Sequence, residues 1–138
     1  MRTLILACGN PLRGDDGVAH AVLRLIEPSP HCALRSVHQL TPELAEEIAR
    51  FSRVVFLDAD AGSKALAIEP LHAFRPRSPL THAASPEEVV ALARALFGFA
   101  GEAFLCRIPA HDFTPGGSPA AGVLKSTQEA AVRIAGMI

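Results

Sequence analysis

Residues 4–17 read LILACGNPLRGDDG, an apolar run followed by a turn with three glycines and two adjacent carboxylates. The run that ends at Cys8 has the length and composition of a strand buried on both faces. After the turn, apolar residues recur at helical spacing (Val18, Val22, Leu25). We therefore expect this stretch to join a first strand to a first helix.

The two carboxylates of this turn belong to Asp15 and Asp16. A glycine-rich turn between a strand and a helix commonly holds phosphate on its backbone N–H groups, but two negative charges would repel an anion. One of the two acids can cap the helix, because the helix dipole favours negative charge at the N-terminus. The residues alone do not decide which acid caps the helix and which is left for a cation or for acid–base chemistry.

The rest of the chain continues the alternation of strand and helix. Its 138 residues are enough for one domain with a sizeable core, and the alternation predicts a doubly wound α/β domain over residues 1–138. Strands are expected at 2–8, 32–38, 54–57, 66–71 and 103–108, and the strand at 66–71 is a candidate edge strand. Helices are expected from Val18, from an N-cap at Thr41 followed by Pro42, from a capping box at Ser85, and from about Ala120 to Met137 with Val123, Thr127, Ala130 and Ile134 inward.

Composition excludes several classes of function. The formal net charge is −1, which gives no electrostatic footprint for nucleic acid. The apolar runs are too short to span a bilayer, and the N-terminal run lacks the length and cleavage site of a signal peptide. Cys8, Cys32 and Cys106 have no metal-type spacing, and we expect buried, reduced thiols in a cytosolic protein.

Two further residues are candidates for chemistry. Asp58 directly follows the strongest predicted strand, at the end where α/β enzymes place functional groups, although an acid there can also form a simple turn. His82 precedes a capped helix, where a solvated histidine is the common alternative. With Asp16 they form a carboxylate–imidazole set that suits a borderline divalent ion such as zinc or nickel.

Other histidines and nucleophiles give weaker signals. His111 and Asp112 follow the last predicted strand and form either a second acid–imidazole pair or an exposed loop. His20 and His38 have no partner visible in the sequence. Serine and cysteine nucleophile motifs and the His-Glu-x-x-His zinc-protease motif are absent from the sequence.

The opening of the chain resembles the hydrogenase maturation endopeptidases, which remove the C-terminal extension of the large subunit of nickel–iron hydrogenases. Residues 9–17 match the family pattern Gly-Asn-x-Leu-x-x-Asp-(Asp/Glu)-Gly. Three later stretches agree with the family in the same order: QLTPELA at 39–45, VVFLDA at 54–59 and THAASPEEV at 81–89. The similarity covers nearly the whole chain.

This resemblance implies a fold, a site and a partner. The fold would be a single three-layer α/β domain, with a twisted, mostly parallel sheet and helices on both faces. Asp16, Asp58 and His82 match the residues that bind a metal ion in the family, which leaves Asp15 as the helix cap. The ion would be nickel already inserted in the hydrogenase large-subunit precursor, so that it belongs to the substrate, and no organic cofactor is implied. We expect a cytoplasmic monomer without nucleic-acid or membrane partners.

The chain departs from the family pattern in two places. Position 16 is Asp where some relatives have Glu, a difference that we expect to be tolerated. Residues 114–119 replace a stretch that is acidic or reads Gly-Glu-x-Leu-Ser in relatives, and the resemblance therefore assigns no function to this last loop.

The expected reaction is hydrolysis of a peptide bond assisted by the ion, with Asp16 or Asp58 as an alternative general base. Whether the ion takes part in the chemistry or is only recognised stays open. A non-catalytic nickel-binding or chaperone module is one alternative. A nucleotide-dependent Rossmann-like enzyme is another, although the three glycines of the first turn do not have the Gly-x-Gly-x-x-Gly spacing of the dinucleotide-binding fingerprint.

Overall fold

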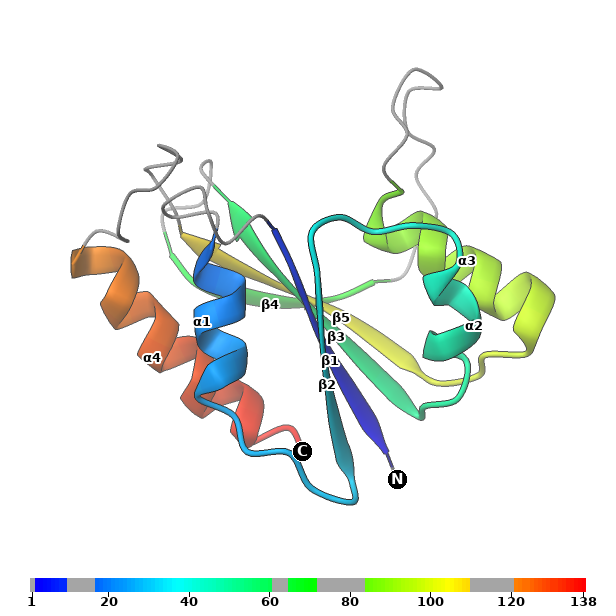
Figure 1. Cartoon of the computed structure of the whole chain (residues 1–138), viewed down its shortest axis with the longest axis horizontal. Coiled ribbons are helices and arrows are strands. Elements are labelled where there is room, and N and C mark those ends of the chain that lie inside the picture. The colour runs from blue at the N-terminus through cyan, green and yellow to red at the C-terminus, as the bar shows by residue number, and fades with distance from the viewer. Residues whose placement is uncertain (1, 10–16, 61–64, 72–83, 110–120) are drawn as a thin grey trace.

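A computed structural model of the chain describes residues 2–9, 17–60, 65–71, 84–109 and 121–138, without the side chains of 121–124. The elements, in chain order, are β1 (Thr3–Cys8), α1 (Val18–Arg24), β2 (Cys32–Val37), α2 (Leu44–Ile48), β3 (Arg53–Asp60), β4 (Ala67–Pro70), α3 (Pro86–Phe97), β5 (Glu102–Pro109) and α4 (Ala121–Ala135) (Figure 1). Within these ranges no helix is long and apolar enough to cross a membrane.

The strands form one sheet in the order β2-β1-β3-β5-β4. Strands β2, β1, β3 and β5 run parallel to one another, and β4 pairs antiparallel with β5 at one edge. The predicted α/β class with a mostly parallel sheet is confirmed, and so is the edge position of the strand expected near residues 66–71.

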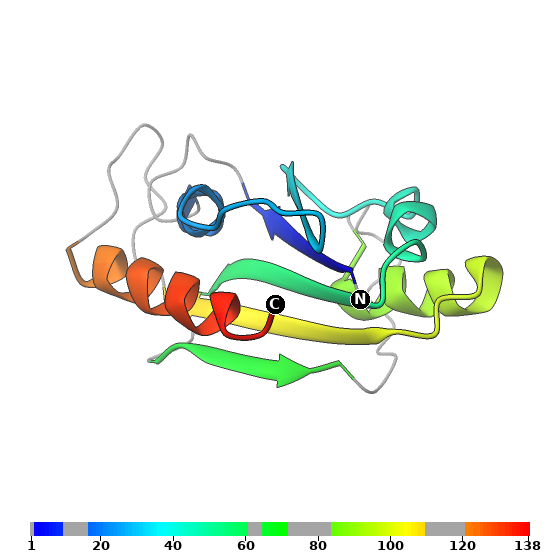
Figure 2. The same ribbon diagram turned by 90° about the horizontal axis from the view of Figure 1, so that it is seen from below.

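Among the described elements, α1 and α4 lie on one face of the sheet and α2 and α3 on the other, which gives three layers (Figures 1 and 2). The helices α1 and α4 pack on one face against β1 and β3 residues that include Ile5, Val55 and Leu57. On the other face, α2 and α3 cover Leu6 and Phe56. Successive side chains of a strand point to opposite faces, which is why the apolar stretches 4–7 of β1 and 54–57 of β3 contribute to both cores.

The start of α3 follows the sequence prediction. The hydroxyl of Ser85 accepts a hydrogen bond from the Glu88 N–H at 3.1 Å, and the Glu88 carboxylate accepts one from the Ser85 N–H at 3.3 Å. Pro86 occupies the first helical position. This reciprocal capping box satisfies two N–H groups that have no partner inside the helix, and it fixes the point where α3 begins.

The predicted start of α2 is wrong. Its N-cap is Glu43, not Thr41. The N–H groups of Leu44 and Ala45 donate to the carbonyls of Thr41 and Pro42, three residues back in each case, at 3.1 Å. Those bonds make a tight turn of the 3₁₀ type, so the α-helix starts only after it and is a short five-residue helix.

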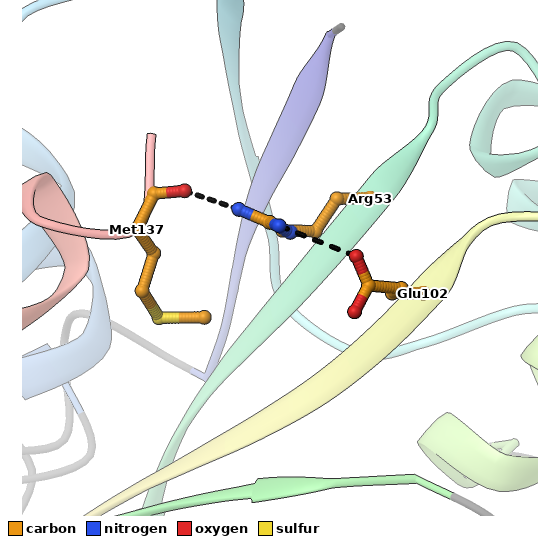
Figure 3. Close-up of polar contacts among 3 residues, drawn as sticks. All are labelled: Arg53, Glu102 and Met137. Atoms are coloured by element: carbon orange, nitrogen blue, oxygen red, sulfur yellow. Dashed lines mark hydrogen bonds and ion pairs between the residues drawn. The ribbon is translucent and has the colours of Figure 1, made fainter.

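The final helix packs as its sequence pattern predicts, and the residues after it are tied to the sheet. Thr127, Ala130 and Ile134 of α4 are buried, whereas the side chain of Val123 lies outside the described residues. The guanidinium of Arg53, at the start of β3, donates one hydrogen bond to the Met137 carbonyl and another to the Glu102 carboxylate at 3.2 Å (Figure 3). One arginine thus links the end of the chain to two adjacent strands.

Replacing Arg53 with Met should lower the free energy of unfolding by about 1–3 kcal/mol, because the Met137 carbonyl loses a charged donor while the aliphatic packing is kept. Glu102→Gln, which removes only the partly exposed ion pair, should cost about 0.5 kcal/mol or less. Urea denaturation measures both. Equal losses in the two variants would show that the link to Met137 contributes nothing.

Candidate functional site

The order of the strands creates a crevice between β1 and β3. The chain leaves β1 through α1 to reach β2 on one side, and it returns through α2 to reach β3 on the other side. In α/β sheets, ligands bind at the carboxyl end of the strands where the connections diverge in this way. Cys8 and Asp58 face each other in register at that position, Cys8 as the last residue of β1.

A cavity of about 310 Å³ lies at this point. Its lining comes from the ends of β1 and β3, the segment after β2 and the start of α3: Cys8, Gln39, Leu40, Phe56, Leu57, Asp58, Ala84, Ser85 and Pro86. Most of the lining is apolar, and Asp58 contributes a solvent-exposed carboxylate. By the alternation along β3, Asp58 lies on the same face as Phe56, the face that α2 and α3 cover.

A backbone hydrogen bond joins two segments of the cavity wall. The Ala84 N–H donates to the Leu40 carbonyl at 3.1 Å, directly before the capping box of α3. The segment that enters α3 is therefore held beside the segment that leaves β2. Together they close the cavity on the side of the sheet opposite to α1.

Asp58 is the one predicted site residue that belongs to the described part of the chain. Asp16 and His82 lie outside it, as do Asp15, His111 and Asp112. Their neighbours are described. The N-cap of α1 is Gly17 and not Asp15, so the expectation that Asp15 caps this helix is wrong. Ala84 lines the cavity with Asp58. Among the described residues, no three His, Cys, Asp or Glu side chains come together as a possible metal site.

The three cysteines differ in their surroundings. All three are reduced thiols. Cys32 and Cys106 are buried as expected, but Cys8 is only partly buried, because the end of β1 opens into the cavity. Burial raises the pKa of the Cys106 thiol to about 12, although the positive charge of Arg133 acts in the opposite direction. Burial also raises the pKa of the Cys32 thiol.

His20 is a residue that sequence reasoning missed. It lies in α1, is 6% exposed, and its ring contacts both the Gly9 carbonyl and the Ser36 hydroxyl. These partners are 11 and 16 residues away in the chain, so no local spacing points to them. The available signal was its position in the helix, since His20 stands next to Ala19 and two residues from both Val18 and Val22 in an apolar stretch.

Solved structures resemble the whole architecture. NiFe hydrogenase maturation protease HycI from Thermococcus kodakarensis KOD1 superimposes with a TM-score of 0.78 at 23% identity, covering 97% of this chain and 90% of that one. The chain has the fold of the hydrogenase maturation proteases.

Two further structures support this statement. The hydrogenase maturating endopeptidase HybD from E. coli gives a TM-score of 0.69 at 16% identity, covering 97% of this chain and 90% of that one. For HybD from Thermococcus kodakarensis the TM-score is 0.69 at 23% identity, with 99% and 98% of the two chains covered. No protein-family model matches the sequence, and no curated protein matches it.

The difference in burial between Cys8 and Cys106 predicts that a thiol reagent labels Cys8 selectively in the native protein. At pH 8, iodoacetamide should modify Cys8 of the native protein much faster than Cys106. The raised pKa keeps the Cys106 thiol protonated at this pH, and the thiolate is the reactive form. Mass spectrometry of peptides after timed quenching gives the two rates, with labelling in urea as the control. Equal native rates would contradict an open cavity at Cys8.

Proposed function

We propose that this chain is an endopeptidase that removes the C-terminal extension of a nickel–iron hydrogenase large-subunit precursor after nickel insertion. The observation that carries this function is the carboxylate of Asp58 in a cavity at the carboxyl end of β1 and β3. The fold shared with hydrogenase maturation proteases supports the same function and favours it over a nucleotide-dependent enzyme.

We assign the contacts to the ion of the precursor to Asp16, Asp58 and His82. Chain connectivity supports including His82: consecutive Cα atoms are 3.8 Å apart, so its Cα is at most about 7.6 Å from that of Ala84, which lines the cavity. Asp16 directly precedes Gly17, the N-cap of α1, so chain connectivity also places it next to a described residue. Two carboxylates and an imidazole are suitable ligands for nickel, a borderline divalent ion.

The reaction adds water across the scissile peptide bond. The water oxygen bonds to the carbonyl carbon, the C–N bond breaks, and a proton passes to the departing amine. A divalent ion at such a site polarises a carbonyl and makes bound water more acidic. A carboxylate that is not fully engaged by the ion can accept the proton of the water and return it to the leaving nitrogen. Asp58, which follows four buried residues of β3, is our first candidate for that role.

The proposed function also bears on domain organisation, location, metal content and substrate contacts. We infer a single domain over residues 1–138 that acts as a cytoplasmic monomer and docks on the precursor. Nickel belongs to the precursor and is not a resident cofactor. The mostly apolar lining of the cavity, with Leu40, Phe56 and Pro86, suits one or two side chains of the substrate peptide beside the scissile bond.

Dependence on nickel tests this function directly. Purified protein should cleave the nickel-loaded precursor of the hydrogenase encoded in the same genome and leave the nickel-free precursor intact, as followed by mass spectrometry of the released peptide. Equal cleavage of both forms would contradict nickel recognition. Binding of the precursor without any cleavage would favour a chaperone.

Asp58→Asn should lower kcat/KM for the loaded precursor by about 100-fold to 10,000-fold, because the amide can neither accept the proton nor neutralise the ion. The matched control is Asp60→Asn, two residues further along β3 and outside the cavity lining, which should stay within about threefold of the wild type. Thermal unfolding of both variants checks that they fold. Wild-type activity in Asp58→Asn would remove Asp58 from the site.

A further inference from the structure

The buried imidazole of His20 makes one hydrogen bond to the residue that starts the acidic turn and a second one to a neighbouring strand. Its Nε2 lies 2.6 Å from the carbonyl oxygen of Gly9, and its Nδ1 is hydrogen-bonded to the hydroxyl of Ser36 in β2. The side chain therefore reaches from α1 to the residue after β1 and to a neighbouring strand.

The partners determine which nitrogen of the neutral ring carries the proton. A carbonyl oxygen only accepts hydrogen bonds, so Nε2 must carry the proton and donate it to Gly9. Nδ1 is then the acceptor, and the Ser36 hydroxyl donates to it. Both ring nitrogens thus have partners. The Gly9 carbonyl fixes the tautomer, and the Ser36 hydroxyl, which can donate or accept, is compatible with it.

Gly9 is held in a conformation that depends on these contacts. Its φ is +144°, a region open to glycine and strained for residues with a side chain. Its N–H donates to the Val37 carbonyl at 3.2 Å, so both backbone polar groups of Gly9 have partners. The direction in which the chain leaves β1 is therefore fixed by β2 and by the ring of His20.

The other end of the turn is fixed by the same helix. Gly17 is the N-cap of α1, and His20 follows it by three residues. The neighbours Val18, Ala19 and Val22 are fully buried against the sheet and α4. A single side chain on a firmly packed helix thus connects the residue before the acidic turn to the helix that begins after it.

We propose that His20 is a positioning residue for the carboxylates of the acidic turn, Asp15 and Asp16, through its hydrogen bond to Gly9. This inference rests on the proposed function, because the turn supplies one of the carboxylates assigned to the site. His20 itself does not touch the substrate. Loss of a hydrogen bond that orients a metal-binding side chain typically lowers activity or metal affinity by about 10- to 100-fold.

Three variants separate positioning from stability. His20→Phe keeps an aromatic ring of similar size and removes both hydrogen bonds. In His20→Gln, the side-chain amide lies near the position of Nε2 and can still donate to the Gly9 carbonyl. The matched control, Val22→Ala, weakens the packing of the same helix two residues away without touching Gly9 or Ser36. The free energy of unfolding of each variant, measured in urea, allows comparison at matched stability.

Two readouts are needed, one with substrate and one without. With nickel-loaded precursor, His20→Phe should lower kcat about 10- to 100-fold with a smaller change in KM. His20→Gln should recover most of that loss, and Val22→Ala should stay within about threefold of the wild type. Without precursor, amide hydrogen exchange in peptides that cover residues 9–17 should be at least tenfold faster in His20→Phe than in Val22→Ala.

The outcomes distinguish a failure of this inference from a failure of the proposed function. Equal losses of kcat in His20→Phe and Val22→Ala, or no recovery in His20→Gln, would overturn the positioning role while the protease function stands. If the wild type cleaves no precursor, the proposed function fails, and hydrogen exchange alone decides on His20. Exchange in residues 9–17 that is no faster in His20→Phe than in Val22→Ala would then overturn it.

Discussion

The structure depends on the opposite directions of two connections, one from β1 through α1 to β2 and one from β2 through α2 to β3. Crossovers between parallel strands are right-handed, so a connection to β2 on one side and a connection to β3 on the other place their helices on opposite faces of the sheet. The connections therefore part above the carboxyl ends of β1 and β3. That parting leaves a cavity where Cys8 and Asp58 lie side by side in register. The buried faces of α1 and α4 and those of α2 and α3 pack on opposite faces of the sheet.

This arrangement puts functional groups on rigid supports. Asp58 lies on a strand whose preceding four residues are buried, so the position of its backbone is set by the core. The loops that meet at the same edge are held by individual hydrogen bonds: Ala84 to Leu40 on the α2–α3 face, and His20 to Gly9 next to α1. Catalysis by positioning requires this kind of support, because small displacements of a reacting group are costly.

Much of the fold could be predicted from the sequence because its signals are local. The apolar run before Cys8, the β-branched strand before Asp58 and the Ser85–Glu88 capping box each specify an element within a few residues. The start of α2 could not be predicted in this way. Thr41 followed by Pro42 is a good capping pair, but a tight 3₁₀ turn uses those carbonyls first.

The candidate site was less predictable, since it depends on contacts between distant segments. The position of Asp58 near the carboxyl end of its strand followed from the sequence pattern. The cavity, however, also requires Leu40 and Ala84, and nothing local in the sequence pairs them. Cys8 was expected to be buried like the rest of its strand, yet it lies where the sheet opens. His20 could not be assigned because its two partners come from β2 and from the residue after β1.

A crystal structure of the protein with nickel(II) bound is the most direct test of the site. We predict a single ion at the carboxyl end of β1 and β3, ligated by Asp16, Asp58 and His82 at the edge of the cavity that Cys8 and Ala84 line. An ion bound elsewhere, or an arrangement in which these three side chains are too far apart to share one ion, would contradict the proposed site.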